Sequence, residues 1–226
     1  MTATVSWWSM GVKGERKATK AVETDRTARR RRANGEQSRR RILDAAAEVA
    51  GERGYDGTSI ALVSGKCGLP ASSIYWHFKD KDDLIAAVIE DSFQRWLAAL
   101  ELPERVNATP EWVLDLAGRV AKALVDTPDF LRLGLMLTLE RRPEEPSARA
   151  VFLRVRGIFR DRIVTVLREF APHLDDESVG LLATYAMAGA DGLFIAKEID
   201  GDRVDLLRLF RLHAQVILDA INEENL

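Results

Sequence analysis

The chain has 226 residues, 46% of them hydrophobic, and a formal net charge of −2, so it can bury one large core or a small and a larger one. The charge is uneven: residues 1–41 hold 12 Lys and Arg against 4 Asp and Glu, whereas the rest of the chain holds 21 against 31. The basic end is where an acidic polymer would bind. A single cysteine excludes an internal disulfide framework and favours a reducing cytoplasm. We expect no signal peptide or membrane span, because the longest apolar run, residues 181–196, is short and contains Asp191.

The first 35 residues carry no helical apolar period and include four consecutive arginines, Arg29 to Arg32. This composition predicts a basic arm, residues 1–35, that is disordered in isolation. The pair Trp7-Trp8 has no predicted partner.

A first helix is predicted over residues 36–54, where apolar residues such as Ile42, Ala46 and Val49 recur at helical spacing. The turn at residues 55–57 follows. Thr58 or Ser59 can then cap a short second helix.

The second helix is predicted to end at Gly68, and Pro70 begins another almost at once. In this third helix Ile74 and Phe78 face inward. The remaining residues 71–77 form an outer face with no acid, small hydroxyls at its start and two large aromatic side chains. Such a face suits the major groove of DNA, where the first turn of a recognition helix reads base edges. The alternative is a packed helical hairpin whose aromatic residues belong to the core.

The segment 68–84, G-L-P-A-S-S-I-Y-W-H-F-K-D-K-D-D-L, resembles the DNA-binding signature of the TetR family of transcriptional regulators. The resemblance covers residues 36–96. It departs from the family pattern at Pro70, which replaces the usual capping serine. It implies a helix-turn-helix domain over residues 36–82, extending to about residue 96 with the linking helix, and the basic arm would add salt-sensitive DNA affinity. The candidate DNA contacts are Thr58, Ser59, Ala71, Ser72, Ser73, Tyr75, Trp76, His77, Lys79 and Lys81.

Helical periods continue through the C-terminal part, residues 83–226, and predict an all-α protein of about nine helices. The predicted spans are 80–100, 111–125, 128–139, 147–170, 178–199 and 202–222. The longest early helix, 80–100, would link the DNA-binding unit to the larger domain.

The last two helices predict a homodimer, because a ridge of small residues permits close approach of another helix and the final helix has two apolar seams, one of them 209–220. The candidate interface residues are Ala183, Ala186, Gly189, Ala190, Leu207, Phe210, Ala214 and Ile217.

The resemblance also implies a pocket for a small, largely apolar effector in the larger domain. The candidate lining residues are Phe93, Trp96, Trp112, Phe130, Met136, Phe152, Phe159 and Tyr185. The sequence therefore predicts a bacterial, cytoplasmic repressor that binds a palindromic double-stranded DNA operator as a homodimer and is released by the effector. The alternative is a helix-turn-helix regulator that activates or acts without a ligand.

We expect no enzyme, cofactor or metal site, since no nucleophile elbow, phosphate loop or paired metal-ligand spacing occurs and the three histidines lie far apart.

Overall fold

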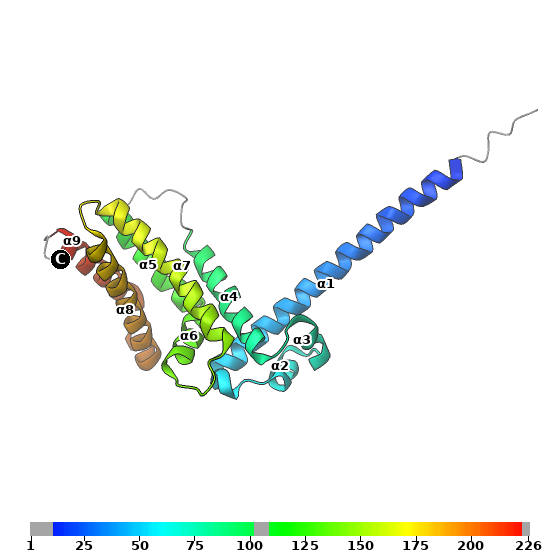
Figure 1. Ribbon diagram of the computed structural model, residues 1–226, viewed down its shortest axis with the longest axis horizontal. Coiled ribbons are helices and arrows are strands. Elements are labelled where there is room, and N and C mark those ends of the chain that lie inside the picture. The colour runs from blue at the N-terminus through cyan, green and yellow to red at the C-terminus, as the bar shows by residue number, and fades with distance from the viewer. Residues whose placement is uncertain (1–10, 102–108, 223–226) are drawn as a thin grey trace, which may run out of the picture.

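The computed structural model describes residues 11–101 and 109–222, with the backbone alone for residues 11–28 and Arg31. Over these ranges it has nine α-helices, one 3-10 turn and no strand (Figure 1). The predicted all-α class is confirmed. Trp7 and Trp8 lie outside the described residues.

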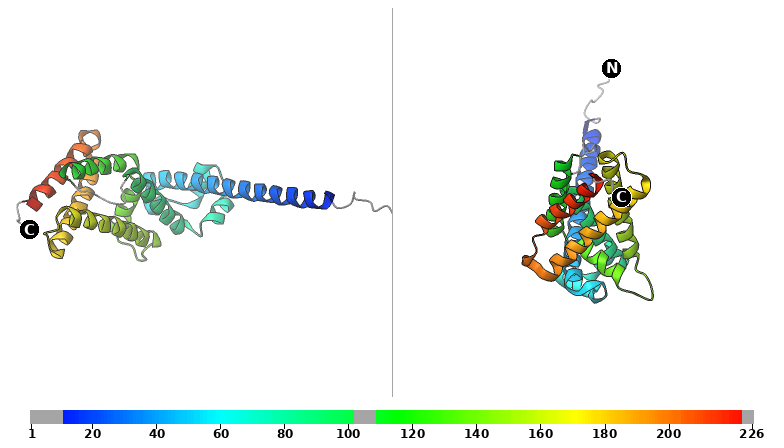
Figure 2. Two further views of the ribbon diagram at one scale, coloured as in Figure 1. Left: turned by 90° about the horizontal axis from the view of Figure 1, so that it is seen from above. Right: turned by 90° about the vertical axis from the view of Figure 1, so that its left-hand side faces the viewer.

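Helix α1 spans Gly11–Gly57 and extends far beyond the rest of the molecule, as the left-hand view of Figure 2 shows. The prediction of disorder for the basic arm therefore differs from the structure from Gly11 onward. From Gly11 onward the arm has only two large apolar residues, Val12 and Val22, but it is rich in Ala, Arg, Lys and Glu and has no proline. These are good helix formers, and a helix already nucleated by its packed part adds further residues at low cost. Near its other end α1 bends at Gly54, which has φ 69°.

Helices α2 (Ile60–Cys67) and α3 (Ala71–His77) pack on the C-terminal half of α1. We call residues 36–78 the reading head. Gly68 ends α2 with φ 66°, as the sequence predicts, and Asp80 caps α4 (Lys81–Ala99) by accepting from Asp83 N. The predicted interior of the reading head is confirmed: Ile42, Ala46, Val49, Val63, Ile74 and Phe78 are buried, and Ile60 packs against them half-buried.

The larger part of the molecule contains α5 (Pro110–Asp126), α6 (Asp129–Leu139), α7 (Ser147–Phe170), α8 (Asp176–Asp200) and α9 (Leu206–Asn222). The 3-10 turn η1, Gly201–Arg203, joins the last two helices. Helix α4 packs on α1, α6 and α7, so it lies between the reading head and the other helices (Figure 1).

One apolar core runs through both predicted domains. It includes Ile42 and Ile74 of the reading head, Phe93 of α4 and Phe152 of α7. A second, smaller core lies between the far ends of α7, α8 and α9. The boundary predicted at residues 82/83 therefore falls inside a shared core, and a movement of α4 affects the packing of both parts.

Helix α8 is more apolar than the sequence analysis expected. Residues 176–203 are long and apolar enough, by length and composition alone, to cross a membrane, and an 18-residue window within them has a mean hydropathy of 1.5. Only 28% of that window is buried within the chain. The exposed remainder includes Leu181, Tyr185, Ile195 and Ile199.

Candidate nucleic-acid interface

The outer face of α3 is open to solvent. Tyr75 is 57% exposed and Trp76 is 76% exposed, whereas Ile74 between α3 and α1 is fully buried. The hydroxyl-bearing Ser72 is exposed and Ser73 is half-buried. The alternative, in which the two aromatic residues belong to the core, is therefore wrong. Large exposed aromatic side chains on a short helix are the arrangement that a groove-reading helix needs.

A hollow separates α3 from α1 on both sides of the Trp76 ring. Its walls come from Asn34, Gly35, Ser38 and Arg39 of α1 and from Ser72, Ser73, Trp76 and His77 of α3. The α1 residues were not among the predicted contacts. Their polar or basic character just after the arginine run was the signal that could have indicated them.

Two of the groups beside this hollow interact with the core of the reading head. The Arg39 guanidinium lies over the Phe78 ring at 5.4 Å from its centroid. Burial, and then the charge of Arg39, lowers the pKa of His77 below its ordinary value. The hollow thus has a fixed cation and an imidazole that favours its neutral form.

Three predicted contacts have other partners in the structure. Thr58 is buried, 3% exposed, and its hydroxyl donates to Gly54 O at 2.7 Å, so it stabilises the bend in α1. Ser59 is exposed and accepts from Leu62 N at 3.3 Å, which makes it the cap of α2. The Lys81 ammonium donates to Tyr55 O at 3.1 Å. Thr58 is therefore withdrawn from the candidate surface, and Lys81 must leave Tyr55 to reach a phosphate.

The ring of Tyr55, at the end of α1, contacts groups from α4 and from the loop after α6. Lys81 Nζ lies 4.3 Å and the Arg142 guanidinium carbon 5.2 Å from the ring centroid. The hydroxyl donates to Asp82 Oδ1 at 3.3 Å. Burial, followed by the negative charge of Asp82, raises the pKa of Tyr55 to about 12. Tyr55 therefore connects the reading head to the larger domain.

Five of the eight predicted pocket residues lie together. Phe93, Trp96, Phe130, Phe152 and Phe159 line a cavity of about 40 Å³. Trp112, Met136 and Tyr185 do not line it. Met136 lies against Gly54 of α1, and Tyr185 faces His213 of α9 with ring centroids 5.3 Å apart. The sequence predicted that these three side chains face the pocket, but the packing of their helices keeps them out of this cavity.

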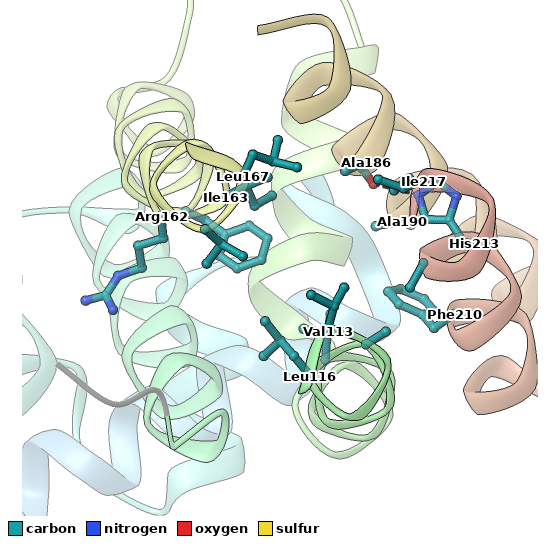
Figure 3. A pocket seen from close by; sticks show the side chains of 15 residues that line it. Val113, Leu116, Arg162, Ile163, Leu167, Ala186, Ala190, Phe210, His213 and Ile217 are labelled. Carbon is teal, nitrogen blue, oxygen red and sulfur yellow. Dashed lines mark hydrogen bonds between the residues drawn. The ribbon is translucent and has the colours of Figure 1, made fainter. Parts of the chain in front are cut away.

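A larger apolar cavity of about 160 Å³ lies next to the first, between α5, α7, α8 and α9 (Figure 3). Of its lining residues the sequence analysis named only Phe159 for the pocket. Val113, Leu116 and Ile163 lie on its walls, and His213 reaches it from α9. Nothing in their spacing separates a cavity wall from ordinary core.

The predicted dimer residues lie mostly inside the chain. Ala183, Phe210, Ala214 and Ile217 are buried. The small residues of α8 make room for α9 of the same chain: a Cβ at Gly189 would lie 2.2 Å from the His213 ring. Ala186 and Ala190 are likewise half-buried in the wall of the larger cavity, and Leu207 alone is well exposed, at 43%. Apart from Leu207, these residues are therefore already packed within one chain.

Besides Leu207, the last two helices expose six large apolar side chains, here called the outer seam: Leu181, Tyr185, Ile195, Ile199, Leu212 and Val216. On α8 they follow spacings of three and four residues, with Ala188 and Gly192 between them, so they share one helix face. Leu212 and Val216 belong to the second α9 seam that the sequence analysis described.

Known proteins resemble the chain in sequence and fold. The family model described as "Bacterial regulatory proteins, tetR family" matches residues 42–88, which comprise most of the reading head and the start of α4. Residues 42–88 therefore match the DNA-binding part of the TetR family.

Curated relatives agree with this TetR assignment. The HTH-type transcriptional regulator AcrR of Shigella flexneri is 35% identical over 63 residues, which are 28% of this chain and 29% of AcrR. The HTH-type transcriptional repressor AcnR of Corynebacterium diphtheriae is 27% identical over 79% of this chain and 92% of its own. The chain thus spans less than a third of AcrR but nearly all of AcnR.

The whole TetR fold is also found among solved structures. The transcriptional regulator FadR of Bacillus subtilis, solved in complex with stearoyl-CoA, aligns with a TM-score of 0.62 at 19% identity. The alignment covers 78% of this chain and 96% of FadR. At that identity the comparison establishes the shared fold only.

Proposed function

We propose that this protein is a TetR family transcriptional repressor that binds a palindromic DNA operator as a homodimer in the bacterial cytoplasm and is released by a small apolar effector. The exposure of Tyr75 and Trp76 on a helix anchored by buried Ile74 carries the proposal. The relatives named above are regulators, and one is a repressor.

The outer seam supports the dimer. It leaves six large apolar side chains of α8 and α9 in solvent, and Ile199 alone is 74% exposed. A second copy of the chain, packed about a two-fold axis, would cover the same seam on both subunits. Two reading heads could then contact half-sites about one helical turn, roughly 34–36 Å, apart.

The two adjacent cavities support the effector. Both are apolar, and Phe93 and Trp96 of α4 line the smaller one. A ligand that binds better when α4 is displaced would shift the population toward dimers whose reading heads have the wrong spacing for DNA.

A gel-shift assay with the DNA upstream of the protein's own gene tests the proposal. The free protein should shift this DNA at nanomolar concentration, and Trp76→Ala should weaken binding by about tenfold or more, as expected for loss of one base contact. Leu139→Ala is the matched control, because Leu139 is 73% exposed at the far end of α6. Equal binding by both variants and the wild type would overturn the role of α3.

A further inference from the structure

Trp96 has a buried polar group without a protein partner. The side chain is 2% exposed, and its indole Nε1 has no hydrogen-bond acceptor among the described residues. An indole N–H can only donate, and a buried donor left unpaired costs folding free energy. Such groups are rare in folded proteins and are candidates for a ligand contact.

The surroundings of Trp96 are aromatic. Its ring lies 4.7 Å from Phe159 in an edge-to-face arrangement and 5.1 Å from Phe130, measured between centroids. These rings line the smaller cavity of about 40 Å³, which is too small for an organic effector by itself. Ligand access therefore depends on the neighbouring space.

Phe159 is the shared wall between the two cavities. It lines both of them, together with Val120 and Ala190, and it is only half-buried. The larger cavity on its other side measures about 160 Å³, enough for a single-ring molecule. Phe159 thus contacts the Trp96 ring, 4.7 Å away between centroids, and also lines the larger cavity.

The charged groups near the cavities have other positions or partners. Arg156 and Asp191, which line the smaller cavity, pair with each other, with Arg156 Nη1 2.9 Å from Asp191 Oδ1. The stem of Arg162 lines the larger cavity, but its guanidinium points away from it (Figure 3). Neither cavity therefore presents an unpaired charge to a ligand.

We propose that the effector is an uncharged aromatic or similarly apolar molecule with one hydrogen-bond-accepting oxygen, such as a ketone, ester or ether. The oxygen accepts the Trp96 N–H, and the apolar part fills the larger cavity past Phe159. This inference rests on the proposed ligand-responsive function. Because Trp96 belongs to α4, a ligand held there acts directly on the helix that follows the reading head.

Two probes of the same heavy-atom skeleton test the proposal: acetophenone, which has a carbonyl oxygen, and isopropylbenzene, which has a methyl group in its place. In the ¹⁵N–¹H spectrum of the full-length wild-type protein, acetophenone should move the Trp96 indole resonance downfield in a saturable manner. Isopropylbenzene should bind without that shift. Trp96→Phe assigns the resonance by deleting it; if that variant does not fold, single substitutions of the other four tryptophans assign it by elimination.

Binding affinities provide the second measurement. Trp96→Phe should weaken acetophenone binding by about tenfold, the effect of one hydrogen bond, and change isopropylbenzene binding by less than about twofold. Trp112→Phe is the matched control and should alter neither, because Trp112 lines neither cavity. Benzoate, the anionic analogue, should bind more weakly than acetophenone.

The proposal is overturned if neither probe moves the Trp96 resonance, which would assign its N–H to buried water, or if benzoate binds more tightly than acetophenone. Equal weakening of both probes by Trp96→Phe would show a packing role only and would also overturn it. The measurements contain no DNA. A protein that shifts operator DNA but fails them refutes this inference alone, whereas failure of the gel shift refutes the proposed function.

Discussion

The carboxylate of Asp82 accepts two hydrogen bonds from Ser147, from its backbone N at 2.7 Å and from its Oγ at 2.5 Å. It also accepts from Ala148 N at 3.1 Å. Helix α7 begins after Pro146 without a side-chain cap of its own. An acid in the first turn of α4 therefore caps α7, and the cap joins the helix next to the reading head to a helix of the larger domain.

Replacing Asp82 with Asn should lower the free energy of unfolding by about 1 kcal/mol, because a neutral amide oxygen is a weaker acceptor for the α7 N-terminus. Burial raises the pKa of Asp82, but the hydrogen bonds from Ser147, Ala148 and Tyr55 outweigh it and hold the pKa below the ordinary 3.8. The stabilisation is therefore present above that pH and lost as pH falls through the depressed folded-state pKa.

Urea unfolding at neutral and acidic pH measures this effect. Glu145→Gln is a suitable control, because Glu145 is an exposed acid just before α7 whose partner, Arg149, lies four residues further along the chain. It should change stability by less than about 0.5 kcal/mol. If the two variants have the same free energy of unfolding at neutral pH, the cap that Asp82 provides does not contribute to stability.

Tyr55 should titrate abnormally late. With a pKa of about 12 against the ordinary 10.0, its neutral form is favoured in the folded state, so this stabilisation is present below pH 10.0 and declines as pH rises through about 12. Phenolate absorbance of the wild type minus that of Tyr55→Phe measures it. In Asp82→Asn the midpoint should move back toward 10.0, because the nearby negative charge is gone. A Tyr55 midpoint unaffected by Asp82→Asn would contradict the contact.

Two glycines should respond to alanine in opposite directions. A Cβ at Gly134 of α6 would lie 2.0 Å from the Phe152 ring, so Gly134→Ala should destabilise the protein by about 1–3 kcal/mol. A Cβ at Gly157 of α7 meets nothing within 4 Å, so Gly157→Ala should stabilise it by about 0.5–1 kcal/mol. Thermal unfolding of both variants measures this. Destabilisation by both would mean that α6 and α7 are not packed as described.

The sequence predicted local structure better than side-chain partners. Apolar spacing and capping residues located the helices closely: Ser147–Phe170 was predicted with the ends that α7 has, and Gly68 and Asp80 mark the predicted boundaries. Helix ends depend on nearby residues, which the sequence shows directly. The helix in the arm before Glu36 was not predicted, because it lacks the apolar face from which helices are recognised in a sequence.

The tertiary contacts of individual side chains were harder to predict from the sequence. Both seams of α9 have helical period, and only the structure shows that Phe210 and Ile217 face α5 and α8 whereas Leu212 faces solvent. Thr58 reads equally well as a phosphate ligand and as a buried donor to Gly54. In each case the helical spacing or the residue type is compatible with two different partners. Which partner the side chain contacts depends on helices that are distant in the sequence.

Lys79 is predicted to contact phosphate. It is exposed, two residues after the end of α3. Lys79→Ala should make the plot of log affinity against log salt shallower by about 1 unit, the contribution of one released counterion. Lys122→Ala, which removes an exposed lysine of α5, should leave the slope unchanged. Fluorescence anisotropy with operator DNA over a salt series gives both slopes; identical slopes for the two variants would exclude the contact.

The outer seam should hold two copies together. Leu212 is 60% exposed within the chain, so Leu212→Glu should fold normally but sediment as a single chain of 25.3 kDa at concentrations where the wild type sediments at twice that mass. Leu139→Glu changes a leucine outside the seam that is 73% exposed, and this variant should remain a dimer. A monomeric wild type, or a dimeric Leu212→Glu variant, would show that the seam is not the interface.

Selection of bound sequences from a random pool of double-stranded DNA tests the central claim most directly, because it asks what a symmetric pair of α3 helices reads. The wild type should enrich an inverted repeat whose half-sites lie about one helical turn apart, and Trp76→Ala should enrich it poorly or relax its sequence. Enrichment of no sequence, or of a single unrepeated site unaffected by Trp76→Ala, would contradict the claim.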